Sequence, residues 1–236
     1  MALPKLNDVP KFNITIPSTG KKVRFRPYLV KEEKVLLMAV ESGDTGAAID
    51  AMVDTIESCI TEKINVSELT TFDVEYLFTQ IRSKSSGESV KLGLKCKKCE
   101  VPNETEVKLD DLKIKMPKIK KTVELNEDVS IELRYPPFSV LTKYDFADDT
   151  ISDAVRSFQL AGECIQAVLF DDERTDNEDI TNEEMQEFLE SMTTEQFKVV
   201  SSFVESMPKL SHTIKFKCVS CDHDNSIVLE EMQSFF

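Results

Sequence analysis

The chain contains two copies of a cysteine motif, and this repetition limits its possible folds more than any other feature. Residues 92–103 and 214–225 both read apolar-x-apolar-Lys-Cys-x-x-Cys-x-x-x-Asn. The residues before each first cysteine alternate between apolar and polar, which is typical of a β-strand with one face toward a core. A second alternating run follows each motif, at 105–109 and 227–229. The pattern predicts two β-hairpins, each with two thiols at its tip.

Four cysteines at two hairpin tips have the composition of a structural zinc site. Such a site takes four thiolate or imidazole ligands in a tetrahedron, with Zn–S distances of about 2.3 Å. One hairpin alone supplies two ligands, so we expect the two tips to meet around one structural Zn2+ ion. The predicted ligands are Cys96, Cys99, Cys218 and Cys221.

Other interpretations of these thiols remain open. They could be free and buried, or form a redox pair or local disulfide, although a thioredoxin-like pair is expected at a helix N-terminus rather than at the end of a strand. His223 could replace one cysteine as a ligand, but its counterpart in the first motif is Val101. Neither motif has the glycine that often follows the second cysteine, because Glu100 and Asp222 occupy that position.

Composition disfavours several classes of function. The 236 residues carry a formal net charge of −14, whereas a nucleic-acid-binding protein needs a clustered basic surface. We expect neither a membrane span nor secretion, because no apolar run is long enough and the first residues lack the apolar segment of a signal peptide. Phosphate-binding glycine motifs are absent, and no nucleophile–base pair can be identified. We therefore expect a non-enzymatic protein with protein partners and no small-molecule substrate.

Regular elements are predicted throughout the first half of the chain. Apolar residues recur every second residue in the strands and every three or four residues in the helices. The predicted elements are, in order, a hairpin over 12–27, helices over 31–41 and 45–61, a helix capped by Thr70 or Thr71, and the first cysteine hairpin.

The second half repeats this order, which indicates an internal duplication. Its predicted elements are a hairpin over 123–133, a helix from about 150 to 170, an acidic solvated loop over 171–184, a helix to Leu189, a helix near 194–204 and the second cysteine hairpin. The cysteines correspond in the same order: Cys59 with Cys164, Cys96 with Cys218, and Cys99 with Cys221. Cys59 and Cys164 lie on apolar helix faces, and we expect both to be buried.

The predicted fold class is therefore α+β, with an internally duplicated unit. The first repeat spans residues 1–115 and the second spans 116–236. Each contains a β-hairpin, helices and a zinc-ribbon-like hairpin with the Cys-x-x-Cys sequence at its tip.

Two further segments are candidates for contacts with partners. Residues 113–121 are basic and are interpreted as the connection between the repeats, since Pro117 disfavours a central strand. A solvated edge is the simpler interpretation of this segment, and a docking patch for an acidic partner is the alternative. At the end of the chain, Phe235 and Phe236 either anchor a partner or fold back onto the core.

Several short segments of the chain resemble a virus protein family. They are Leu3-Pro4-Lys5, residues 16–27 with 31–34, Met207–His212 and the final Phe235-Phe236. On these residues the chain resembles the T4-type bacteriophage baseplate hub proteins, which are hub subunits and hub-assembly factors of contractile tails. The resemblance implies a non-enzymatic protein with other phage hub and tail proteins as partners. It also implies a location in the virion tail baseplate, or in the host cytoplasm during assembly.

A second hypothesis is a zinc-ribbon adaptor that recruits transcription or replication machinery through the two tips. A basic tip surface would favour it. The first tip has Lys95, Lys97 and Lys98, but the second has Asp222 and Asp224, so the two tips differ in sign.

Overall fold

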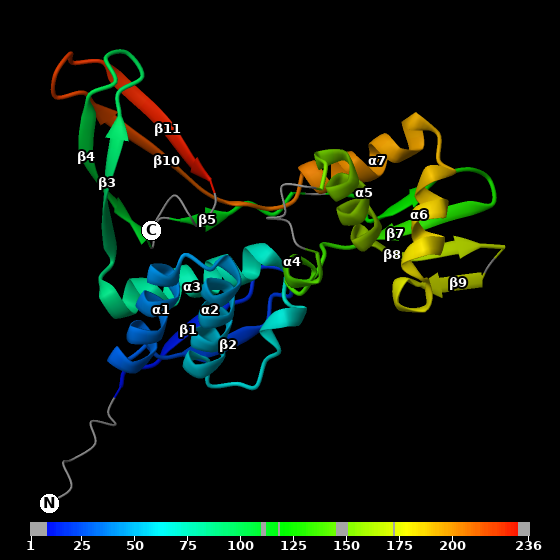
Figure 1. The fold of residues 1–236 in the computed structure, drawn as a ribbon, viewed down its shortest axis with the longest axis horizontal. Coiled ribbons are helices and arrows are strands. Elements are labelled where there is room, and N and C mark those ends of the chain that lie inside the picture. The colour runs from blue at the N-terminus through cyan, green and yellow to red at the C-terminus, as the bar shows by residue number, and fades with distance from the viewer. Residues whose placement is uncertain (1–8, 110–111, 118, 145–150, 172, 231–236) are drawn as a thin grey trace, which may run out of the picture. The chain divides into compact units, whose positions relative to one another are not determined.

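A computed structural model describes residues 9–109, 112–117, 119–144, 151–171 and 173–230, and shows an α+β protein (Figure 1). The chain divides into two compact units. Unit 1 comprises residues 1–115 and 209–236, and unit 2 comprises residues 116–208. None of the helices among the described residues has the length and hydrophobicity needed to cross a bilayer.

Unit 1 begins with a short antiparallel hairpin followed by helices. Its first elements are β1 (Phe12–Thr15), β2 (Lys22–Phe25), α1 (Val30–Ser42), α2 (Thr45–Cys59), η1 (Val66–Glu68) and α3 (Thr71–Ser86). Gly43 ends α1 in the left-handed conformation at φ 70°, which glycine adopts without a steric penalty. Thr70 caps α3, since its side chain accepts a hydrogen bond from the Asp73 N–H. The helices predicted for the first half are confirmed.

Two antiparallel strand pairs complete unit 1, and they lie side by side although they are far apart in the sequence (Figure 1). They are β3 (Ser89–Lys95) with β4 (Pro102–Lys108), and β10 (Leu210–Lys217) with β11 (Asp224–Glu230). A two-residue strand, β5 (Lys113–Ile114), adds to the other edge of β10 and ends before Pro117. Their apolar faces share one core, whose buried members are Val107, Leu109, Leu112, Leu210 and Ile214.

Unit 2 is a four-stranded antiparallel sheet with helices packed on it. The strand order is β6 (Thr122–Glu124), β7 (Val129–Leu133), β8 (Ile165–Phe170) and β9 (Glu173–Asp176). The helices are α4 (Val140–Lys143), α5 (Asp153–Cys164), the 3-10 turn η3 (Asn177–Asp179), α6 (Asn182–Glu190) and α7 (Thr194–Glu205). Residues from the sheet and from α5, α6 and α7 form the core of this unit. The side chain of Thr193 caps α7 as Thr70 caps α3.

The helix predicted from about 150 to 170 is wrong in its second part. Helix α5 ends at Cys164, and the residues that follow are the strand β8. Ile165 and Ala167 are buried while Gln166 between them is exposed, which is the two-residue period of a strand. Pairing with β7 therefore decides the structure of this apolar run.

The acidic loop predicted over 171–184 also contains regular structure. Residues Glu173–Asp176 form β9, which pairs with β8, and Thr181 caps α6 from Asn182. All four side chains of β9 are exposed, so the acidic character of this segment is that of a solvated edge strand.

The residue boundaries of the compact units differ from those of the two predicted repeats. Residues 209–230 pack with the first part of the chain, because β10 pairs with β5 and shares a core with β4. The first boundary between the units, after Lys115, falls in the basic segment interpreted as a connection. Phe235 and Phe236, the candidate anchor, lie outside the described residues.

Candidate metal centre

The loops that follow β3 and β10 have the same backbone geometry. In the first loop the Cys96 N–H donates to the Val101 carbonyl at 3.0 Å, and the Glu100 N–H donates to the Cys96 carbonyl at 2.9 Å. The equivalent bonds in the second loop run from Cys218 N–H to His223 O at 2.9 Å and from Asp222 N–H to Cys218 O at 3.1 Å. Both loops therefore turn each pair of thiols toward the same side.

The residue after the second cysteine adopts the conformation that favours glycine. Glu100 has a φ of 57° and Asp222 a φ of 56°. This left-handed region costs an L-residue roughly 1–2 kcal/mol. The absence of glycine at this position therefore raises the conformational free energy of each loop, and the loop still adopts the left-handed backbone conformation.

The four cysteine sulfurs of these loops form one cluster. The Sγ atoms of Cys96, Cys99, Cys218 and Cys221 all lie within 4.8 Å of one another. Across the two loops, the Cys96 and Cys221 sulfurs are 3.7 Å apart and the Cys99 and Cys218 sulfurs 3.6 Å. A tetrahedron with Zn–S bonds of about 2.3 Å has edges of about 3.8 Å, so the spacing suits a single ion. A disulfide would need about 2.05 Å, and all six cysteines are free thiols.

Electrostatics shift the pKa values of two thiols of the cluster in opposite directions. Burial opposes ionisation of Cys96, but the backbone N–H groups of Cys99 and Lys98 outweigh it and lower the pKa of Cys96 to about 6. At Cys221 the N–H of His223 favours the thiolate, but lost hydration and the neighbouring sulfurs raise the pKa to about 12. Four negative charges cannot accumulate at this spacing without a cation, and binding of a divalent metal would remove that obstacle.

Two buried asparagines hold the loops against each other. The Oδ1 atom of Asn225 accepts the Lys97 N–H at 2.9 Å, and the Oδ1 atom of Asn103 accepts the Val219 N–H at 2.9 Å. Each asparagine therefore bonds to the loop of the other strand pair. Asn225 also donates to the Cys96 sulfur at 3.5 Å. Such bonds from outside the ligand set orient metal ligands and tune them.

Both asparagines are part of the sequence motif, at the same distance after its second cysteine. The sequence pattern alone assigns them no role. Their side chains are nearly fully buried, each with 3% exposure. A recurring polar residue inside an otherwise alternating strand is the signal that could have identified them.

The other candidate residues lie outside the cluster. His223 contributes its carbonyl oxygen to the loop, its side chain is exposed, and the group of potential ligands among the described residues consists of the four cysteines. Cys59 and Cys164 are buried, as predicted, with 1% and 0% exposure. Loss of hydration raises the pKa of Cys59 to about 11 and that of Cys164 to about 12, so both remain neutral thiols.

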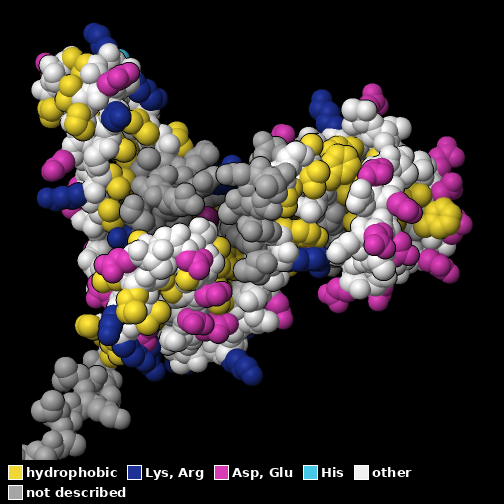
Figure 2. Space-filling view, in the orientation of Figure 1, with side chains coloured by type: hydrophobic (Ala, Val, Ile, Leu, Met, Phe, Trp, Pro, Cys, Tyr) yellow, Lys and Arg dark blue, Asp and Glu magenta, His cyan; other side chains and the backbone are white. Residues whose placement is uncertain are grey.

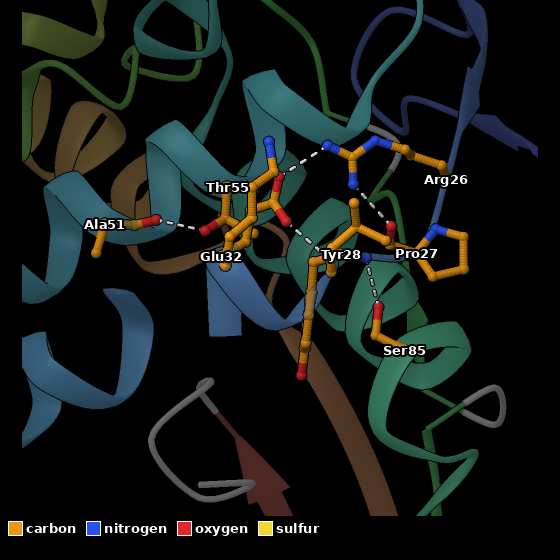
Figure 3. A network of polar contacts seen from close by, with 9 residues as sticks. Arg26, Pro27, Tyr28, Glu32, Ala51, Thr55 and Ser85 are labelled. Carbon is orange, nitrogen blue, oxygen red and sulfur yellow. Dashed lines mark hydrogen bonds and ion pairs between the residues drawn. The ribbon is translucent and has the colours of Figure 1, made fainter. Parts of the chain in front are cut away.

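A polar network at the start of α1 is a second feature that sequence reasoning missed (Figure 3). Glu32 is buried and accepts hydrogen bonds from the Arg26 guanidinium and from the Leu29 N–H, both at 2.8 Å. Although burial alone would raise it, these donors and Lys31 hold the pKa of Glu32 below its usual value. The network joins the end of β2 to the first turn of α1.

Comparison with known protein families gives one match over nearly the whole chain. A family described as T4 bacteriophage base plate protein matches residues 9–236. No curated protein and no solved structure matches the chain.

Proposed function

Because the chain belongs to the T4 bacteriophage base plate protein family, we propose that it is a hub component or hub-assembly factor of a contractile tail. It acts through contacts with other hub and tail proteins, without catalysis, in the tail baseplate or in the host cytoplasm during assembly. The observation that carries the proposal is the family match over residues 9–236.

A structural zinc ion at Cys96, Cys99, Cys218 and Cys221 is part of the proposal. It is supported by the sulfur spacing, the matching loop geometry and the reciprocal asparagine bonds. The ion would join two strand pairs that are separated by the whole of unit 2 in the sequence. It would thus close a long loop in the chain. A cross-link lowers the conformational entropy of the unfolded chain most when the loop that it closes is long.

We also propose that the chain arose by internal duplication. After each N-terminal hairpin, an arginine N–H donates to the carbonyl of the cysteine that ends a helix: Arg26 to Cys59 at 3.0 Å, and Arg134 to Cys164 at 2.8 Å. Phe25 and Ile60 form a bridge in unit 1, and Leu133 pairs with Ile165 in unit 2. The second half differs by the added β8–β9 pairing and by α6, which takes the place of η1.

The test is recovery of partners from infected cells with tagged protein, followed by mass spectrometry and compared with the composition of purified particles. We expect other baseplate proteins in the recovered complex, and presence in particles would separate a hub component from an assembly factor. Recovery of transcription or replication proteins without tail proteins would contradict the proposal and favour the adaptor hypothesis, which no observation supports.

A further inference from the structure

Helix α1 has an unusual distribution of apolar residues. Its one buried residue is the charged Glu32, and its most extensive packing within the unit is against α2. Its large apolar side chains face solvent instead: Val30 is 79% exposed, Val40 70%, Met38 59%, Leu37 57% and Val35 50%. Figure 2 shows hydrophobic side chains on the surface of this helix.

This exposure does not result from loose attachment of the helix. The ion pair between Arg26 and Glu32 ties the first turn of α1 to the end of β2 (Figure 3), and α1 also packs against α2. A helix that is apolar on several sides is normally buried. The ion pair and the packing on α2 thus hold α1 on unit 1 while leaving an apolar outer face available for a partner.

The charges on the outer face indicate what that partner is. Val30, Lys34, Leu37 and Glu41 follow one another at four- and three-residue steps, so they lie in one row on the side away from Glu32. Lys34 lies toward the N-terminal end of the row and Glu41 toward the C-terminal end, with Leu37 and Met38 between them, and all four are exposed. If an identical row lies beside it in the antiparallel direction, the lysine of each row is near the glutamate of the other.

We propose that α1 forms an antiparallel contact with α1 of a second copy of this chain. A twofold axis near Leu37 would bury the Leu37 and Met38 side chains of both copies. It would bring Lys34 of each copy toward Glu41 of the other, on both sides of this apolar centre. It would also place each Glu41 near the N-terminal end of the opposite helix, where the helix dipole favours an anion, instead of at its own C-terminus, where it does not.

The expected association is weak and depends on concentration. Helix α1 has 13 residues and is about 20 Å long, so two such helices bury less than the roughly 800 Å² per partner of a standard stable interface. In an assembling baseplate, high local concentration would compensate for low affinity. The proposal is independent of the metal centre and of the identity of the tail proteins that bind elsewhere.

Sedimentation equilibrium of the full-length protein, from about 1 µM to 1 mM, tests the contact. We expect a reversible monomer–dimer equilibrium for the wild type. Leu37→Glu should weaken it by about tenfold or more, because it places two negative charges at the centre of the apolar contact. Circular dichroism should show unchanged folding, since Leu37 makes little contact within its own chain.

Charge reversal distinguishes the antiparallel arrangement from other modes of association. Lys34→Glu and Glu41→Lys should each weaken the dimer, because each creates like-charge neighbours at both ends of the contact. The double variant should restore it, and the control Lys63→Glu, at an exposed site outside α1, should leave it unchanged. A wild type that stays monomeric to about 1 mM would overturn the proposal, and so would a double variant as weak as the single ones.

Discussion

The side-chain oxygen of Asn225 accepts a hydrogen bond from the backbone N–H of Lys97, at 2.9 Å, although the two residues are 128 positions apart in the chain. Asn103 makes the reciprocal bond to Val219. The cluster of four cysteines is therefore held by a pair of equivalent cross-links as well as by any ion it binds. Two strand pairs that are each marginal alone become one unit through this arrangement.

The first prediction concerns these asparagines. Asn103→Ala and Asn225→Ala should each destabilise the protein by about 0.5–1.5 kcal/mol, because the change removes the hydrogen bond between the asparagine side chain and a backbone N–H of the opposite loop. Each should also lower zinc affinity by about 10–100-fold, as expected for loss of a residue that orients the ligands. Chemical denaturation and competition with a chromophoric chelator measure the two effects. Ser226→Ala, at the exposed neighbouring position, is the matched control, and equal behaviour of Asn225→Ala and this control would contradict the assigned role.

The second prediction concerns the ligands. Each of Cys96→Ser, Cys99→Ser, Cys218→Ser and Cys221→Ser should lose the same metal ion, because both loops contribute to one site. Elemental mass spectrometry of protein purified without added zinc or a metal-binding tag should give about one zinc per wild-type chain. Cys59→Ser and Cys164→Ser should retain the metal, since these thiols are at helix ends and are not among the four clustered sulfurs. A wild type without zinc, or metal loss from only one loop's variants, would refute the shared site.

The third prediction is the effect of a chelator on stability. Metal binding to a site that the unfolded chain lacks contributes to folding, so removal of zinc should lower the thermal midpoint of the wild type. The same chelator should not affect Cys96→Ser, which has no complete site to lose. An equal response of both proteins in differential scanning calorimetry would indicate that the chelator acts elsewhere.

The fourth prediction concerns Glu32. Its pKa is lowered in the folded state, so its contribution to stability is present above the unfolded value, near 4.5, and is lost as pH falls through the folded value. Glu32→Gln should therefore be less stable than the wild type by about 1–3 kcal/mol at pH 7, with the difference shrinking below about pH 4.5. Urea denaturation at several pH values measures this, with Glu33→Gln as the control. A difference that does not depend on pH would show that the charge of Glu32 is unimportant.

The fifth prediction concerns Asp73, which is fully buried at the start of α3. Its carboxylate accepts hydrogen bonds from the Thr70 hydroxyl at 2.6 Å and from the Ser18 N–H in the first hairpin turn at 2.9 Å. Asp73→Ala should cost about 1–3 kcal/mol, because it leaves these donors without an acceptor. Asp50→Ala, at an exposed position of α2, should cost much less, and similar losses in thermal denaturation would argue against this role for Asp73.

Much of the local structure could be predicted from the sequence because it depends on neighbouring residues. Apolar spacing predicted α1, α2 and α3, Thr70 and Gly43 mark helix ends through their own backbone preferences, and the α+β class followed from these elements. The burial of Cys59 and Cys164 followed from their places on apolar helix faces. The four cysteines were expected to meet because one hairpin offers too few ligands, which is an argument from metal chemistry.

Tertiary structure alone decided the features that depend on distant partners. Residues Ile165–Phe170 are a strand because β7 offers a free edge, since a short apolar run by itself fits a helix equally well. Glu32 is buried because Arg26 lies beside it, and Asn225 has a role because Lys97 reaches it across the fold. The second strand pair joins unit 1 because its apolar face is completed there. In each case the contact is between segments whose sequence patterns are independent of each other. It stabilises the structure only after the chain has folded and brought those segments together.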